Sequence, residues 1–488
     1  MTAPKALSAS DRKALLEDLC GLKTDDDDAV QQDAKWFLPL DTHRRALRPE
    51  TLVVRGGRGT GKSALFHFLG HLRRLHREGA VKRLPLGQAF EASTWIEGYG
   101  AAIDHPHLGV VGDFARSADD DRQRAFWFGW LCIQLSHGSG EALPPGALAG
   151  VAATAGRQHT PAALADAAAR QLAGLSSWMD GLERGLQRPV VVLYDGLDRI
   201  GSAFTERCST TASLLRMWLS LADRYRRIRP KVFVREDLFQ KSIDRFPDAS
   251  KLDARSVSLD WRVEDLYRVL IKHMANLSPR LRDWVQSSAR GAVPLEEQGP
   301  LGWMPPEPLP LFGRPSQKGF VDHMAGELMG SGAKKGFTYS WIPNRLQDAH
   351  SRVAPRSIMS LVRHASEHAL ERGPSAVRLR LLHPEELQAA LESTSKRRAN
   401  ELQEEFPVVA RLENLRTKTV MLSRREAVSL LARAAVTPDD HGSDGEAVLR
   451  ALIDLGAASE RPDGRIDIPD IYRYGFGILR GGGVKRPR

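Results

Sequence analysis

Residues 56–63 read Gly56-Gly57-Arg58-Gly59-Thr60-Gly61-Lys62-Ser63, and this stretch decides the fold. It follows the apolar residues 52–54, which predict a buried strand, and precedes apolar residues at helical spacing over 64–75. Strand, glycine loop and helix form the setting in which backbone N–H groups wrap a phosphate. All eight residues are therefore expected to bind a nucleotide. Lys62 should reach its β- and γ-phosphates, and Ser63 should coordinate Mg²⁺.

Four further apolar runs predict the other strands of a sheet, at residues 94–96, 190–194, 231–234 and 257–259. The run at 190–194 is continuous and mostly β-branched, as expected for a parallel strand buried on both faces. Helical patterns, among them 124–135 and 214–225, lie between the runs. Strands that alternate with helices predict an α/β fold with a parallel sheet. The aromatic residues within 124–135 are interpreted as core rather than as a platform for stacked bases.

Two carboxylates follow the run at 190–194, in the sequence Asp195-Gly196-Leu197-Asp198. A carboxylate at the C-terminal end of a parallel strand lies where open α/β sheets bind their ligands. Asp195 is therefore expected to hold Mg²⁺ beside the phosphate loop. Asp198 is expected to orient the attacking water, and the alternative is that it caps the N-terminus of a helix.

Two arginines are candidates for contact with the nucleotide. Arg235 ends a predicted strand and is expected at the same sheet edge, where it would sense the γ-phosphate or stabilise transferred charge. The alternative is an ion pair with Glu236 or Asp237. Arg356 begins a predicted helix beyond the sheet domain. It is expected either to close onto the nucleotide from a lid or to form a structural ion pair.

The sequence predicts four parts: an N-terminal adaptor segment at 1–40, the α/β core at 41–275, a helical lid with a Pro/Gly-rich insertion at 276–400, and a winged-helix-like domain at 401–488. The last prediction rests on helical patterns at 424–435 and 445–455, followed by the hairpin-turn signal Pro462-Asp463-Gly464. The acidic run at 25–28 is expected to be a solvated turn.

The chain resembles the AAA+ and STAND group of P-loop ATPases at residues 57–63, at 195–198, at Arg235 and at Pro355-Arg356 ahead of a winged helix. The spacing of Asp195 and Asp198 is similar to the Walker B motif of NACHT-type STAND proteins. Gly196 stands where many AAA+ proteins carry an acid, and Arg199 stands where the NACHT-type motif usually has one. The resemblance therefore leaves open which carboxylate activates water.

The resemblance implies an ATPase that uses Mg²⁺, converts ATP to ADP and phosphate, and binds ATP between core and lid. Hydrolysis would switch a closed, oligomeric state to an open one. Bacterial proteins of this build are often signalling or phage-defence ATPases that act through an effector protein. A ring would need an arginine that reaches the neighbour's site, and the candidates are Arg224, Arg226, Arg227 and Arg229. The alternative for these four is a solvated basic turn.

Two other functions stay open: a nucleic-acid remodeller or loader, and a scaffold that binds ATP without hydrolysing it. The net charge of +10 permits contact with nucleic acid. Residues 401–488, however, carry equal numbers of acidic and basic side chains, with a short basic tail at Lys485, Arg486 and Arg488. DNA binding by the C-terminal domain is therefore not favoured, because a DNA-binding module normally has a basic face.

The composition indicates a soluble protein, with 42% hydrophobic and 27% charged residues. No stretch approaches the ~20 apolar residues that a membrane span needs. The N-terminus has no apolar core of a signal peptide. Cys20, Cys132 and Cys208 are far apart and predict reduced thiols rather than a disulfide or a metal site. A cytoplasmic location without membrane contact is expected.

Overall fold

The computed structural model describes residues 7–24, 33–77, 93–100, 105–154, 160–201, 203–287, 291–373, 380–434, 439 and 442–481, without the side chains of 71–77, 154, 249 and 333. The acidic run at 25–28 and the basic tail at 485–488 lie outside these residues. The chain divides into two units. We call Gln31–Asp260 the sheet unit, and Met1–Val30 with Trp261–Arg488 the helical unit.

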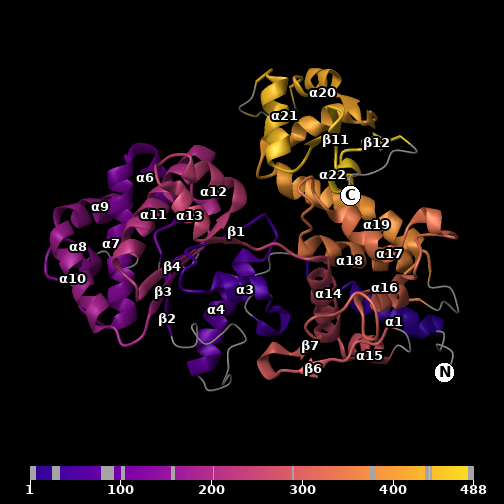
Figure 1. Ribbon diagram of the computed structural model, residues 1–488, viewed down its shortest axis with the longest axis horizontal. Coiled ribbons are helices and arrows are strands. Elements are labelled where there is room, and N and C mark those ends of the chain that lie inside the picture. Colours follow the sequence, from indigo (N-terminus) through magenta and orange to yellow (C-terminus); the bar gives the residue numbers. More distant parts are fainter. Residues whose placement is uncertain are drawn as a thin grey trace. The chain divides into compact units, whose positions relative to one another are not determined.

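A five-stranded parallel sheet forms the centre of the sheet unit (Figure 1). In spatial order its strands are β2 (Thr94–Tyr99), β3 (Val190–Tyr194), β4 (Ile228–Arg235), β1 (Val53–Gly56) and β5 (Ser256–Ser258). All neighbouring strands run parallel. Each predicted apolar run is a strand, so the predicted α/β fold with a parallel sheet is confirmed. Strand β4 lies between β1 and β3, which the order along the chain does not reveal.

Helices precede or connect these strands and cover the sheet. They are η1 (Ala34–Trp36), α3 (Asp41–Ala46), α4 (Lys62–Arg77), α6 (Leu108–Ser117), α7 (Asp120–Ser139), α8 (Ala147–Thr154), α9 (Pro161–Arg170), α10 (Leu172–Gly185), η2 (Leu197–Arg199), α11 (Phe204–Arg224), α12 (Glu236–Ile243) and α13 (Ala249–Ala254). Helices α7 and α11 pack on each other, and each also contacts a strand of the sheet. The insertion of α6 to α10 between β2 and β3 makes this connection the longest in the sheet unit.

Helix α7 supplies the aromatic part of the core of the sheet unit. Its buried rings are Phe126, Trp127, Phe128 and Trp130. The indole N–H of Trp130 donates to the carbonyl oxygen of Gly98 (2.6 Å), and that of Trp127 donates to the carbonyl oxygen of Thr210 (3.1 Å). The interpretation of this cluster as core is confirmed, since buried rings cannot serve as a platform for bases.

The helical unit gathers both ends of the chain. Its helices are α1 (Ala9–Leu19), α14 (Val263–Leu277), α15 (Pro279–Ser287), η3 (Gly299–Leu301), α16 (Gln317–Ala325), η4 (Ala333–Lys335), α17 (Thr338–Leu346), α18 (Pro355–Glu371), α19 (Pro384–Gln403), η5 (Pro407–Leu415), α20 (Arg424–Leu431), α21 (Gly445–Asp454) and α22 (Asp470–Arg473). Two short strands, β6 (Glu296–Glu297) and β7 (Trp303–Met304), pair antiparallel within the Pro/Gly-rich segment. In the described parts of both units, no helix is long and apolar enough to cross a membrane.

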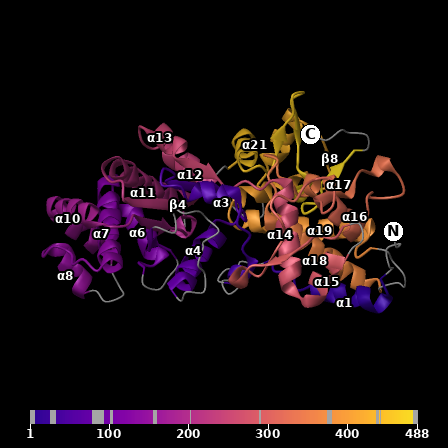
Figure 2. The same ribbon diagram turned by 60° about the horizontal axis from the view of Figure 1, so that its bottom comes forward.

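Helix α1 packs on α14, α15 and α18, as Figure 2 shows. Helix α1 also makes polar contacts, because the buried side chain of Arg12 reaches α19. The Nη2 group of Arg12 donates to both carboxylate oxygens of Glu386 (2.9 and 3.0 Å), and Nε donates to the carbonyl oxygen of Leu381 (3.1 Å). The first helix of the chain is thus an integral part of the helical unit.

The last part of the helical unit has the arrangement of a winged helix. Helices η5, α20 and α21 pack on one another. Strands β10 (Ser459–Glu460), β11 (Arg465–Asp467) and β9 (Leu422–Ser423) form an antiparallel sheet in that order. In the predicted turn between β10 and β11, the N–H of Gly464 donates to the carbonyl oxygen of Arg461 (2.8 Å). The predicted helices followed by a hairpin are confirmed. A further pair, β8 (Thr419–Val420) with β12 (Leu479–Arg480), is parallel.

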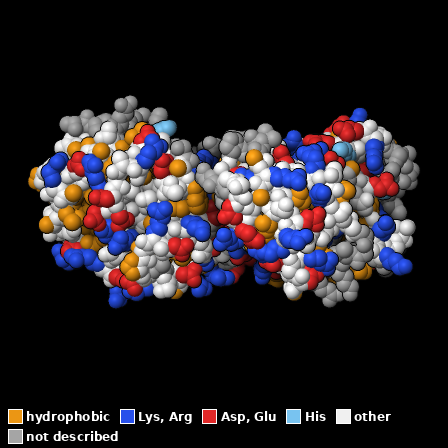
Figure 3. All heavy atoms as spheres, turned by 90° about the horizontal axis from the view of Figure 1, so that it is seen from above, with side chains coloured by type: hydrophobic (Ala, Val, Ile, Leu, Met, Phe, Trp, Pro, Cys, Tyr) orange, Lys and Arg blue, Asp and Glu red, His pale blue; other side chains and the backbone are white. Residues whose placement is uncertain are grey.

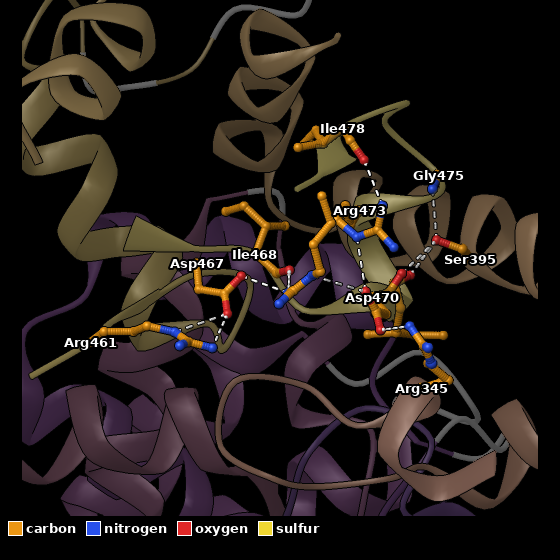
Figure 4. Close-up of polar contacts among 11 residues, drawn as sticks. Arg345, Ser395, Arg461, Asp467, Ile468, Asp470, Arg473, Gly475 and Ile478 are labelled. Atoms are coloured by element: carbon orange, nitrogen blue, oxygen red, sulfur yellow. Dashed lines mark hydrogen bonds and ion pairs between the residues drawn. The ribbon is translucent and has the colours of Figure 1, made fainter. Parts of the chain in front are cut away.

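Buried ion pairs hold this winged helix together and tie it to α17 (Figure 4). The carboxylate of Asp470 accepts from Arg345 Nη1 of α17 (2.6 Å) and from Arg473 Nε (2.9 Å). Asp467 accepts from Arg480 Nη2 (2.7 Å). The two carboxylates are 2% and 4% exposed, so each needs the arginine that faces it.

Candidate nucleotide-binding site

The phosphate loop, residues 56–63, connects β1 to α4 along a path that requires glycine. Gly61 has a φ of 92°, which other residues rarely adopt, and it directly precedes α4. A Cβ atom at Gly56 would lie 2.4 Å from Thr60 Oγ1, so Thr60 would have to shift to admit any other residue there. Thr60 Oγ1 donates to the carbonyl oxygen of Gly57 (2.9 Å) and braces the loop.

Lys62 is the first residue of α4, and the loop holds its amino group. Lys62 Nζ donates to the carbonyl oxygens of Gly56 (3.0 Å) and Gly57 (2.9 Å). Desolvation lowers the pKa of Lys62, while the negative charges of Asp198 and Asp195 act in the opposite direction. A phosphate here would meet both this amino group and the positive end of the helix dipole.

Ser63 and Asp195, the two expected ligands of Mg²⁺, are in contact. The hydroxyl of Ser63 donates a hydrogen bond to the carboxylate of Asp195. Asp195 directly follows β3, and its N–H donates to the carbonyl oxygen of Tyr99 in β2 (3.0 Å), which fixes the backbone. Burial raises the pKa of Asp195, and the charge of Asp198 acts in the same direction. The hydrogen bonds from Ser63 and from the Gly196 N–H lower it.

Asp198 lies in η2, close enough to Lys62 and Asp195 for its charge to act on both. Its negative charge affects the pKa of both Lys62 and Asp195. The N-cap residue of the next helix, α11, is Ala203. The alternative in which Asp198 caps that helix is therefore wrong. The role of Asp198 in orienting water stays a prediction.

Arg235 ends β4 level with Gly56 of β1, to which it is paired in the parallel register. Its side chain is 5% exposed and forms a fork with Asp237. Arg235 Nε lies 3.0 Å from Asp237 Oδ1, and Arg235 Nη2 lies 2.7 Å from Oδ2. Glu236 pairs instead with Arg55, at 3.3 Å. The predicted ion-pair alternative is thus present, with Asp237 as the partner, and contact with a γ-phosphate stays a prediction.

Arg356 belongs to the helical unit, where it is the second residue of α18. Its Nη1 group lies 3.5 Å from Glu401 Oε1 of α19. The same carboxylate group also pairs with Arg397 and Arg398. The structural ion pair that the sequence offered as an alternative for Arg356 is therefore present. Binding of a nucleotide by Arg356 stays a prediction.

The four arginines proposed for a neighbour's site lie around the start of β4, at the opposite end of that strand from Arg235. Arg224 Nε donates to Asp180 Oδ1 (2.8 Å), and Arg229 Nη1 donates to the carbonyl oxygen of Ala222 (2.8 Å). Arg227 Nη1 donates to the carbonyl oxygen of Leu186, between α10 and β3. These bonds fit the basic-turn alternative, and a role in a neighbouring subunit stays a prediction.

The described residues fit a nucleotide with its metal. Hydroxyl and carboxylate oxygens are the hard ligands that Mg²⁺ prefers, and Ser63 and Asp195 supply them side by side. The start of α4 and the loop N–H groups suit phosphates. Sequence reasoning named Asp237 only as an ion-pair partner, although its charge also reaches Lys62. The sequence feature that could have indicated this role of Asp237 is its place two residues after an arginine that ends a strand.

Comparison with known proteins identifies no family for this chain. No protein-family model matches it, and no curated protein is similar to it. Among solved structures, the chain is similar in outline to the ORC2 protein of Aeropyrum pernix in ADPNP and ADP complexes, with 12% identity over 87% of this chain and 86% of that one, and a TM-score of 0.36. Cdc6p from Pyrobaculum aerophilum matches with 11% identity over 92% of this chain and 98% of that one, and a TM-score of 0.30.

Proposed function

We propose that the protein is an ATP-dependent molecular switch of the AAA+ type that binds ATP with Mg²⁺ in the phosphate loop and hydrolyses it. One observation carries the proposal: the Ser63 hydroxyl of the loop is bonded to Asp195 at the end of β3. The contact joins the two groups expected to hold the metal, at the sheet edge where Lys62 begins a helix. A glycine loop that bound nothing would not need a carboxylate from another strand at this point.

Each residue of the site has a role in binding or hydrolysis that follows from its chemistry. Lys62 and the loop N–H groups bind the phosphates, and Ser63 with Asp195 holds Mg²⁺, which supplies charge neutralisation when bound. Asp198 accepts a hydrogen bond from the attacking water and orients it in line with the γ-phosphate. Arg235 stabilises the negative charge that develops on the transferred phosphoryl group.

Nucleotide titration of the purified full chain tests this proposal. ATP should bind only with an intact Lys62, Mg²⁺ should strengthen the binding, and phosphate should be released at a rate that depends on Asp195. Tight binding without phosphate release would support the non-hydrolysing scaffold instead. If neither ATP nor ADP binds at millimolar concentration, the proposal is wrong.

A nucleic-acid remodeller or loader is the better supported of the downstream roles. The observation in its favour is the winged-helix arrangement of η5, α20, α21 and the β10–β11 hairpin, a relative of the helix-turn-helix modules that enter a DNA groove. The named solved structures, ORC2 and Cdc6p, add no weight, because both TM-scores are low. Signalling or phage defence through an effector protein has no observation of this kind behind it.

Charge limits how the winged helix could meet DNA. Arg424 at the start of α20 pairs with Glu446 (2.6 Å) and Glu460 (2.5 Å), so its charge is compensated within the domain. Basic and acidic side chains are interspersed on the face that Figure 3 shows. DNA-stimulated ATP turnover that weakens steeply with salt would favour the loader role. Turnover that is indifferent to DNA at low salt would exclude it and favour a protein effector.

A further inference from the structure

Asp237 is the carboxylate that faces Arg235, and it holds the guanidinium group in a defined geometry. Asp237 lies in the first turn of α12, two residues after the end of β4. It binds Arg235 through two bonds, from Nε (3.0 Å) and from Nη2 (2.7 Å). A fork of this kind fixes the plane of the guanidinium group as well as its distance.

Because Arg235 is buried, its positive charge needs a nearby negative charge, which Asp237 supplies. Arg235 is 5% exposed and Asp237 is 25% exposed. A cation with so little access to water is strongly destabilising unless an anion faces it. Lys62 is a second cation close enough that Arg235 lowers its pKa, although desolvation is the larger cause. The charge of Asp237 raises the pKa of Lys62, so Asp237 acts on both cations.

Asp237 engages one edge of the guanidinium group of Arg235, through Nε and Nη2. Arginine has five N–H donors, and Asp237 engages two of them. Pairing with Asp237 therefore does not by itself prevent Arg235 from meeting a phosphate. A carboxylate that holds one edge of the group is the arrangement expected where the direction of the other donors matters.

We propose that Asp237 is a positioning residue for Arg235: it fixes the guanidinium group in the orientation that meets the γ-phosphate and compensates its charge while no nucleotide is bound. The inference rests on the proposed function, because it takes the phosphate loop to bind ATP. Asp237 itself is not expected to touch the nucleotide. Its effect should therefore require Arg235 and should distinguish ATP from ADP.

A double-mutant cycle on the full chain tests the proposal, with ATP and ADP titrated at the same Mg²⁺ and salt concentrations. Asp237→Asn should weaken ATP binding roughly tenfold, because the oriented charge-assisted contact is lost, and should change ADP binding less than about twofold. In the Arg235→Ala background, the same substitution should change ATP binding less than about twofold. A full effect without Arg235, an equal loss for both nucleotides, or tighter ATP binding would each overturn the proposal.

Two further variants guard against a folding artefact. Asp166 forms the same Nε and Nη2 fork with Arg122, at 3.1 and 3.2 Å, but on the surface. Asp166→Asn is the matched control and should leave both affinities unchanged. If Asp237→Asn does not fold, Asp237→Glu keeps the charge but alters the fork, and it should still reduce the preference for ATP over ADP. Parent-like preference in Asp237→Glu would then contradict the proposal.

The proposed function can fail separately. If Lys62→Ala binds ATP as the parent does, the phosphate loop is not the site, and the assignment of Arg235 fails with it. If Lys62→Ala abolishes binding while Asp237→Asn leaves the preference for ATP unchanged, only the role of Asp237 is wrong.

Discussion

Arg235 and Gly56 occupy paired positions at the ends of the neighbouring parallel strands β4 and β1. This register brings the last residue of one strand to the first residue of the phosphate loop. It requires β4 and β1 to be neighbours, and they are, because β4 separates β1 from β3 in the sheet. The end of β4 therefore lies between the end of β1, which leads into the phosphate loop, and the end of β3, which leads into Asp195.

Arg235→Ala should weaken the binding of ATP far more than that of ADP. Loss of a well-formed, shielded charge-assisted hydrogen bond costs roughly 1.5–3 kcal/mol. At ~1.4 kcal/mol per tenfold, ATP affinity or turnover should fall by about one to two decades. Parallel titrations of both nucleotides measure the difference. An equal loss for the two would mean that Arg235 supports the fold or the diphosphate rather than the γ-phosphate.

Substitution of Asp195 and of Asp198, the two carboxylates after β3, should have different effects on nucleotide binding and turnover. Asp195→Asn should weaken Mg²⁺-dependent nucleotide binding, because it removes a negative charge bonded to Ser63. Asp198→Asn should leave binding intact and slow turnover by roughly 10²–10⁴-fold if Asp198 acts as a general base on the water. Binding and phosphate release are measured on the same preparations. Hydrolysis by Asp198→Asn at the parent rate would remove Asp198 from the mechanism.

The elements of the sheet could be predicted from the sequence because each parallel strand is a short apolar run with a glycine, proline or charged boundary. The wing could be predicted because Pro462-Asp463-Gly464 has the chemistry of a tight turn. The order of the strands could not, since β4 pairs with β1 across more than 170 residues of sequence. That order is what brings Arg235 to Gly56.

The buried ion pairs could not be predicted either. Arg12 and Glu386 are 374 residues apart, and Arg345 and Asp470 are 125 apart. In a chain with 70 Lys and Arg residues, no local pattern distinguishes the few arginines that are buried from the many that are solvated. For the same reason the sequence could not decide whether Glu236 or Asp237 pairs with Arg235.

Lys231 should make stability depend on pH. Its buried amino group donates to the carbonyl oxygens of Arg48 and Thr51, and burial lowers the pKa of Lys231 from 10.5 to about 7. Between these two values the unfolded chain binds the proton and the folded chain does not, so stability rises as pH increases across this window. Below about pH 7 the contribution of Lys231 to the free energy of unfolding no longer changes with pH.

Lys231→Met removes this titration and serves as the comparison. The free energy of unfolding of the parent, relative to this variant, should rise by about 2–3 kcal/mol between pH 7 and pH 9.5. Denaturant unfolding of the sheet unit within the full chain, followed at both pH values, gives the difference. A difference that does not change with pH would mean that Lys231 titrates at its ordinary value.

Asp470→Ala should loosen the winged helix. The substitution leaves Arg345 and Arg473 without the buried carboxylate that faces them, at a cost of roughly 3–5 kcal/mol. Hydrogen exchange of the amides of α20 and α21 should accelerate accordingly. The exposed pair of Asp463 with Arg465 (2.6 Å) provides the control, because Asp463→Ala removes only a solvent-screened ion pair and should leave hydrogen exchange unchanged. Equal protection in both variants would show that the buried pairs do not hold this domain.

The most direct test of the central claim is the affinity of Lys62→Ala for ATP in the presence of Mg²⁺, measured by calorimetry beside the parent. Lys62 Nζ is held by the carbonyl oxygens of Gly56 and Gly57, within the loop that we expect to bind the phosphates. We predict that the variant keeps the circular dichroism spectrum of the parent and binds no ATP at concentrations that saturate the parent. Unchanged affinity in a variant with an unchanged spectrum would contradict the assignment of residues 56–63 as the nucleotide site.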